Sequence, residues 1–95
     1  MATAEVSLVR DNREQNRFEL ETPAGLAVAD YRRDGDVLII FHTEVPVAIH
    51  GRGIGEKLVR GALNEIQRRK LKVGPGCWFV RRVMEGDPLY RDLLA

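Results

Sequence analysis

Hydrophobic and polar positions alternate along much of the first half of the chain, and this pattern predicts β-strands. Residues 17–21 alternate strictly, so Phe18 and Leu20 are expected to face one side while the charged side chains face water. Residues 6–9 and 26–32 are also rich in β-compatible side chains and predict a first and a third strand. Turn-forming residues separate the three segments, so we expect an antiparallel meander.

A longer apolar segment follows and predicts the central strand of the sheet. The Asp-Gly pair at 34–35 tolerates positive φ and is typical of a tight hairpin turn, so the third strand is expected to pair with the fourth. Residues 36–45 then continue largely without alternation, as in a strand that is buried on both faces. A period of two along this strand predicts that His42 and Glu44 face the same side as Ile40.

A glycine-rich stretch at 51–55 precedes an amphipathic pattern of about sixteen residues, in which apolar side chains recur at intervals of three and four. This pattern predicts a helix. Residues 71–73 can form a strand after it, and a strand-helix-strand crossover implies parallel pairing. Residues 77–84 and 89–94 predict short closing helices with leucines as anchors. The expected fold class is α/β, with a mixed sheet: antiparallel N-terminal strands joined to a parallel β-α-β unit, then a C-terminal helical segment.

Composition limits the remaining possibilities. The chain has 95 residues, 44% of them hydrophobic, and we expect one domain over residues 1–95. The longest apolar run, residues 37–41, is too short for a membrane span, and the first residues lack a signal-peptide pattern, so we expect a cytoplasmic protein without membrane contact. A single cysteine and two histidines offer neither an internal disulfide nor the usual ligands of a structural zinc site, and no metal is expected.

The net charge of +1 conceals a basic block in the middle of the chain. Residues 50–73 carry seven basic and two acidic side chains, whereas residues 1–49 carry five basic and nine acidic ones. A global charge near zero argues against a nucleic-acid-binding protein, while the local surplus favours a small polyanionic ligand. The alternative is that the helix carries a solvated basic face.

The glycines between the central strand and the helix are the main functional signal. Free N–H groups in the first turn of a helix, with the helix dipole behind them, form a phosphate site, and glycines let a ligand approach the backbone. Arg52 and Lys57 add positive charge at this end. Glu56 stands where a dinucleotide-binding loop needs glycine, and Gly-Lys-Ser/Thr is missing, so a Rossmann site and nucleotide hydrolysis are both disfavoured. The alternative is a loop whose glycines serve packing only.

The order of these features resembles motif A of the GNAT superfamily, the acetyl-CoA-dependent N-acetyltransferases. Val45 and Pro46 are followed by the glycine-rich loop at the start of an amphipathic helix. More narrowly, the chain resembles a branch of minimal GNAT-like proteins of about this length, in which the extra helices and strands of larger GNAT enzymes are missing. This narrower resemblance covers roughly residues 5–95 and rests on segments 17–20, 42–46, 51–55, 75–77 and 88–90.

The resemblance implies a binding site for acetyl-CoA. Backbone N–H groups of the loop would hold the pyrophosphate of coenzyme A, and pantetheine would run along the end of the central strand at Glu44 and Val45. One position departs from the superfamily pattern, because His50 stands where the motif has Gln or Arg. The loop residues implied in cofactor binding are Gly51, Arg52, Gly53, Ile54 and Gly55.

Two residues are the candidates for catalysis. Cys77 stands where a helix is expected to start, and a helix N-terminus favours the thiolate form of cysteine. The minimal GNAT-like branch has a cysteine in the matching place, where it is a proposed catalytic residue. The alternative is that Cys77 only lines the acetyl pocket. His42 is a candidate general base because imidazole titrates near neutrality, with Glu44 as a weaker one; the alternative is a histidine ring hydrogen-bonded within the sheet.

The expected function is acetyl-CoA binding with acetyl transfer to an amine, either directly or through an acetylated Cys77. The sequence does not specify the acceptor, which is a small molecule or a protein. So short a chain leaves few residues for a substrate pocket, and a partner subunit would then complete it. Two other classes of function stay open: a non-catalytic acyl-CoA-binding sensor, and a protein-interaction module that uses the basic helix face.

Overall fold

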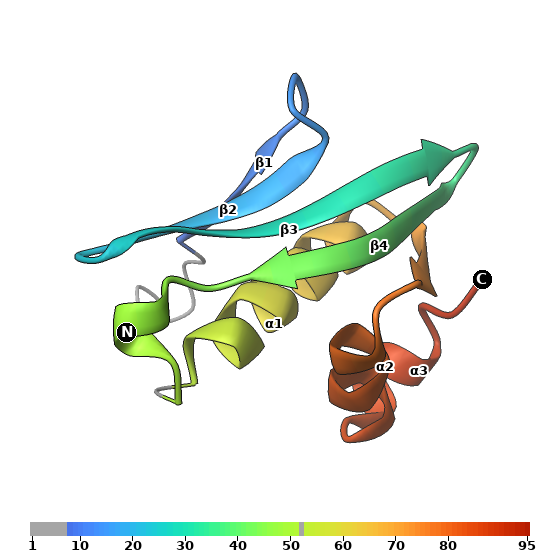
Figure 1. The fold of residues 1–95 in the computed structure, drawn as a ribbon. Helices are drawn as coiled ribbons and strands as arrows, with labels where there is room; N and C mark the ends of the chain where they lie inside the picture. Colours follow the sequence, from blue (N-terminus) through green and yellow to red (C-terminus); the bar gives the residue numbers. More distant parts are fainter. Residues whose placement is uncertain (1–7, 52) are drawn as a thin grey trace, which may run out of the picture.

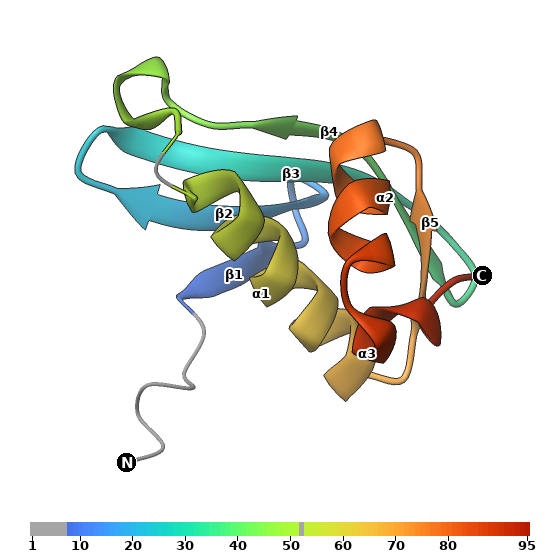
Figure 2. The same cartoon turned by 90° about the horizontal axis from the view of Figure 1, so that it is seen from below.

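The computed structural model describes residues 8–51 and 53–95. A five-stranded sheet carries the helices of this part of the chain on one face, and no described element covers its other face (Figures 1 and 2). The elements in chain order are β1 (Val9–Asn12), β2 (Arg17–Thr22), β3 (Gly25–Asp34), β4 (Val37–Glu44), the 3-10 turn η2 (Val47–Ile49), α1 (Ile54–Arg68), β5 (Lys72–Pro75), α2 (Trp78–Glu85) and α3 (Pro88–Arg91).

The strands lie in the order β1-β2-β3-β4-β5, and neighbours are antiparallel except for the parallel pair β4 and β5. The predicted hairpin joins β3 and β4, and Gly35 in its turn has a φ of +62°. Helix α1 makes the predicted crossover from β4 to β5. The α/β fold class with its mixed sheet is therefore confirmed. Among the described residues, no helix has the length and hydropathy needed to span a bilayer.

The core lies between the sheet and α1. The apolar stripe of α1 is fully buried, which confirms the helix predicted from its spacing. Leu71 and Val73 continue this core into β5, and Val80, Val83 and Met84 add the inner face of α2. The sheet side chains that meet α1 come from alternate positions of three strands: Phe18, Leu20, Ala27, Ala29, Tyr31, Leu38 and Ile40.

A β-bulge in β4 changes which side chains face the helices. Ile40 and His42 pair with consecutive residues of β3, which leaves Phe41 as the extra residue of the bulge. Ile40 is fully buried against the helices, whereas His42 is exposed and lies 3.4 Å from Glu44 on the open face. The prediction that His42 and Glu44 face the same side as Ile40 is therefore wrong, because the extra residue shifts the alternation by one.

The first strand lies later in the chain than predicted. Part of the predicted segment, residues 6 and 7, lies outside the described residues, and β1 runs from Val9 to Asn12. Polar residues are tolerated in this strand because each finds a partner. The Asp11 carboxylate accepts hydrogen bonds from the Tyr31 hydroxyl at 2.6 Å and from the Arg69 guanidinium at 2.7 Å. This contact ties β1 to the C-terminal end of α1.

Glu19 of β2 is also not where the alternation predicts. It faces away from the helices, but it is only 5% exposed, because neighbouring polar side chains cover it. Its carboxylate accepts hydrogen bonds from Arg17 at 2.7 Å and Asn12 at 2.9 Å, and Arg10 lies 3.5 Å away. The hydrogen bonds from Arg17 and Asn12 lower the pKa of Glu19 from its ordinary value.

This lowered pKa predicts acid sensitivity. A carboxylate with a lowered folded-state pKa adds stability above the unfolded value, and that contribution is lost as pH falls through the folded value. Replacing Glu19 by Gln should lower the free energy of unfolding at pH 7 by about 1–3 kcal/mol, the range for hydrogen bonds to charged groups. The difference should shrink between about pH 5 and pH 3. Urea denaturation at several pH values measures this, with the exposed Glu21→Gln as control on the same strand. A constant difference across that pH range would contradict the prediction.

The C-terminal segment forms the predicted helices, and one of its three leucines anchors it as predicted. Leu93 is buried in the core, whereas Leu89 is 67% and Leu94 44% exposed, and Tyr90 is buried as well. The Tyr90 hydroxyl donates to Asn64 of α1 at 2.8 Å, and the guanidinium of Arg60 lies over its ring at 5.6 Å. Arg60 also donates to Asp87 at 3.0 Å, so α3 is held to α1 by polar contacts as well as by apolar packing.

Candidate functional site

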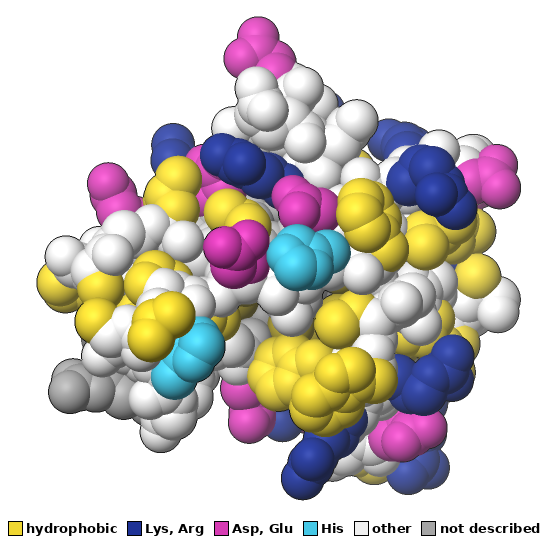
Figure 3. Space-filling view, viewed as in Figure 1, with side chains coloured by type: hydrophobic (Ala, Val, Ile, Leu, Met, Phe, Trp, Pro, Cys, Tyr) yellow, Lys and Arg dark blue, Asp and Glu magenta, His cyan; other side chains and the backbone are white. Residues whose placement is uncertain are grey.

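A groove of about 760 Å³ opens where β4 ends, between the loop that leads to α1 and the start of α2. In Figure 3, which has the orientation of Figure 1, apolar side chains gather below the centre of the molecule, and carboxylates lie beside a histidine above them. Arg52 lies outside the described residues, and Glu44 is 73% exposed beside the groove. The predicted site residues that line the groove are His42, Val45, Gly51, Gly53, Ile54, Gly55 and Cys77.

The loop before α1 has the backbone geometry of an anion site. Gly51 and Gly53 adopt φ values of +82° and +75°, and Gly53 is the N-cap residue of α1. A side chain at either position would meet no described atom within 4 Å, so the space beside the loop is open. No side chain caps this helix, and the first N–H groups of a helix have no partner within it. The loop therefore fits a phosphate group held by backbone donors.

Gly55 has a different role, because it makes room for packing. A Cβ atom there would lie 3.3 Å from two ring carbons of Phe79 and 3.6 Å from Val45. The first turn of α1 thus contacts both α2 and the end of β4 only because this residue lacks a side chain. The glycine stretch therefore has two roles: Gly51 and Gly53 leave room for a ligand, and Gly55 leaves room for packing.

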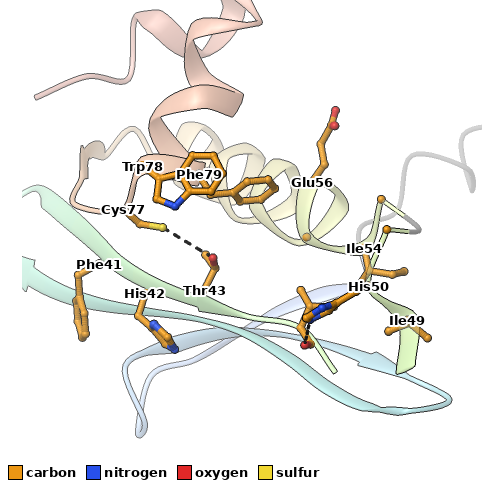
Figure 4. Close-up of a pocket in the computed structure, with 14 residues that line it drawn as sticks. Phe41, His42, Thr43, Ile49, His50, Ile54, Glu56, Cys77, Trp78 and Phe79 are labelled. Atoms are coloured by element: carbon orange, nitrogen blue, oxygen red, sulfur yellow. Dashed lines mark hydrogen bonds between the residues drawn. The ribbon is translucent and has the colours of Figure 1, made fainter. Parts of the chain in front are cut away.

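His50 ties the loop to the end of β4. Its Nε2 atom lies 2.7 Å from the carbonyl oxygen of Val45 (Figure 4). A carbonyl only accepts, so Nε2 carries the proton and donates. This hydrogen bond within the protein uses the Nε2 donor of the ring. The backbone N–H groups of the loop therefore remain as donors for an anion.

Cys77 lies at the other end of the groove. It is the N-cap residue of α2, as predicted, and its side chain makes no capping hydrogen bond. The thiol is half-buried, and its Sγ atom lies 3.8 Å from Oγ1 of Thr43 on β4. Figure 4 shows these two side chains pointing toward one another.

The candidate base is not beside the candidate nucleophile. His42 and Phe41 point to the side of β4 away from Cys77 (Figure 4). The Nε2 atom of His42 lies 3.4 Å from Oε1 of Glu44, so these two exposed side chains form a pair of their own. The groove reaches both sides of the strand end, but His42 and Cys77 do not share a face.

Sequence reasoning missed the residues that surround Cys77. Thr43 was unremarkable in the sequence, and only the bulge turns it toward α2. Trp78 is 70% exposed at the rim of the groove, and its indole packs edge-on against Phe79 with ring centroids 5.9 Å apart. Two adjacent aromatics directly after the cysteine are the signal that could have indicated an apolar wall at this end.

Comparisons with known proteins agree with this architecture. A family model described as GCN5-related N-acetyl-transferase matches residues 17–93. Protein NATD1 of Gallus gallus and of Homo sapiens is 40% identical to this chain over 48 residues, half of the chain, and these matches span 44% and 42% of the relatives' own length. A solved GCN5-like protein of Staphylococcus aureus superimposes with a TM-score of 0.68 at 26% identity, covering 94% of this chain and 89% of the other.

Proposed function

The chain belongs to the GCN5-related N-acetyltransferase family, and from this premise we propose that it binds acetyl-CoA and transfers the acetyl group to an amine. The observation that carries the proposal is the single groove that joins the open glycine loop at Gly53 to the thiol of Cys77. An anion site at one end of the groove and a thiol at the other match the pyrophosphate and the thioester of an acyl-CoA molecule.

The loop and the strand end are the parts of the chain that would hold the cofactor. The backbone N–H groups from Gly51 to Gly55 would bind the pyrophosphate, since the positive φ values and open surroundings of Gly51 and Gly53 let phosphate oxygens come close. Glu44 and Val45 would accompany the pantetheine arm along the end of β4. Glu56 in the first turn does not oppose this, because its carboxylate is paired with Arg60 at 2.8 Å.

Acetyl-CoA supplies an acetyl group activated as a thioester, and Cys77 is proposed to receive it. The Cys77 sulfur would lose its proton to solvent and form a bond to the acetyl carbon, while the bond from that carbon to the coenzyme A sulfur would break and the released thiolate would take up a proton from solvent. The acceptor amine, of a small molecule or a protein, would then attack the acetyl carbon, lose a proton to solvent and release the Cys77 sulfur, which would take up a proton again. The alternative is direct transfer, in which His42 or water would deprotonate the amine and no bond to Cys77 would form.

A non-catalytic acyl-CoA-binding protein is the second candidate. The observation that favours it is that His42 is paired with exposed Glu44 rather than with the thiol, so the groove has a binding end without an obvious base. No described element covers the open face of the sheet, where a partner subunit would complete an acceptor pocket (Figure 1).

The ligand class is tested by isothermal titration calorimetry. Coenzyme A and acetyl-CoA should bind at least about tenfold more tightly than ATP or NAD, a difference of about 1.4 kcal/mol. All four ligands carry adenosine and phosphates, so the difference measures what coenzyme A has in addition, namely its pantetheine arm and its ribose 3′-phosphate. Equal affinity for ATP or NAD would contradict the proposed cofactor.

A further inference from the structure

The surroundings of the Cys77 sulfur are set by the bulge in β4. Thr43 follows the bulge, and its side chain faces the helix layer instead of the open face. Its Oγ1 atom lies 3.8 Å from Sγ of Cys77, close enough for a weak hydrogen bond in which either atom donates. Two residues far apart in the chain thus meet at the groove.

Backbone contacts hold these two side chains in register. The N–H of Gly76 donates to the carbonyl of Ile40 at 2.9 Å, just before Cys77 on one side and the bulge on the other. A side chain at Gly76 would approach that carbonyl to 3.3 Å, so the two backbones are closely packed here. Strand pairing therefore brings the backbones of Thr43 and Cys77 close enough for their side chains to meet.

The other side chains near the sulfur are poor partners for it. Phe79 offers only aromatic surface, and the indole N–H of Trp78, which could donate, makes no hydrogen bond to the sulfur in the described part of the chain. His42 and Glu44 are paired with each other and lie on the other side of the strand. Among the described residues, the Thr43 hydroxyl is the polar side-chain group placed to respond when the thiol loses its proton.

We infer that Thr43 is a positioning residue that controls the reactivity of Cys77. When the thiol proton leaves to solvent, the hydroxyl turns its O–H toward the sulfur and donates to the thiolate, which it stabilises and aims into the groove. Hydrogen bonds to charged groups are stronger than neutral ones, so the contact favours the reactive form of the side chain. The inference rests on the proposed function for its role in acetyl transfer, but the contact itself can be tested without that function.

The test is the rate at which iodoacetamide alkylates the protein at pH 7, followed by intact mass. Cys77 is the only cysteine in the chain, so the mass change reports this thiol alone. Thr43→Val keeps the shape of the side chain and removes the hydroxyl, and it should slow alkylation about fivefold, the equivalent of one hydrogen bond of about 1 kcal/mol. Thr43→Ser keeps the hydroxyl and should react within about twofold of the parent. Equal rates for the valine variant and the parent would overturn the inference.

Acetylation by acetyl-CoA separates this inference from the proposed function. The valine variant should be acetylated at least about fivefold more slowly than the parent. If the parent is not acetylated but its alkylation depends on Thr43, the covalent route fails and the inference stands. If the parent is acetylated and the valine variant reacts equally fast with both reagents, the inference fails and the covalent route stands. Should Thr43→Val not fold, Thr43→Ala replaces it in the same comparison with Thr43→Ser.

Discussion

Replacing Gly53 by Val is expected to abolish measurable binding of coenzyme A. Gly53 has a φ of +75° at the N-cap of α1, a conformation that costs a residue with a side chain roughly 1–2 kcal/mol and is worse for a β-branched one. A side chain there would enter the open space beside the loop, where the pyrophosphate is proposed to bind. Loss of several backbone hydrogen bonds should weaken binding by at least about a hundredfold, measured by titration calorimetry.

A second glycine provides a matched control for the backbone strain. Gly35 has a similar φ of +62° and equally open surroundings, but it lies in the turn before β4, whereas the groove lies where β4 ends. Gly35→Val should therefore lower the melting temperature as Gly53→Val does and leave coenzyme A binding unchanged. Normal binding by a folded Gly53→Val protein would place the cofactor elsewhere, and loss of binding in both variants would point to a damaged fold.

Most of the fold could be predicted because its elements are encoded by short-range patterns. Alternation identified β2, the Asp-Gly pair identified the hairpin, and the apolar stripe from Leu58 to Ile66 identified α1. A strand-helix-strand order then leaves parallel pairing as the regular arrangement. These features depend on residues that lie close together in the sequence, so they can be predicted from a single sequence.

Which side chains of β4 face the helices could not be predicted, because a bulge depends on how the strand pairs with its neighbour. Phe41 is the extra residue, and nothing in its type distinguishes it from its apolar neighbours. Its position decides the site, since it turns Thr43 toward Cys77 and sends His42 to the open face. One extra residue therefore decides which side chain of β4 lies beside the thiol.

The burial of charged side chains is the second feature that could not be predicted from local sequence patterns. Glu19 and Asp11 were expected at exposed or turn positions, because charged side chains are rarely buried without partners. Arg17 lies on the same strand as Glu19, two residues away, but Asn12 of β1 also donates to Glu19, and Arg69, just after α1, donates to Asp11. Only the assembled fold brings Asn12 to Glu19 and Arg69 to Asp11.

Intact-mass measurement is expected to show that acetyl-CoA acetylates the parent protein once in the absence of any acceptor, and that Cys77→Ala and Cys77→Ser do not react. The thiol is the one group of the groove that could form a thioester, and hydroxylamine should remove the label from the parent. Alanine is close in size to cysteine, and the Cys77 side chain makes no capping bond, so the variant should keep the fold and bind coenzyme A.

His42→Ala distinguishes the possible outcomes of this experiment. Its ring lies on the other side of β4, so the covalent route predicts that this variant is still acetylated on Cys77. If Cys77→Ala acetylates amines from a polyamine and peptide panel as fast as the parent, and His42→Ala does not, transfer is direct and Cys77 only lines the pocket. If the parent binds acetyl-CoA but neither acquires the label nor modifies any amine, the groove serves binding alone. The labelling result carries more weight than the panel, because it needs no knowledge of the acceptor.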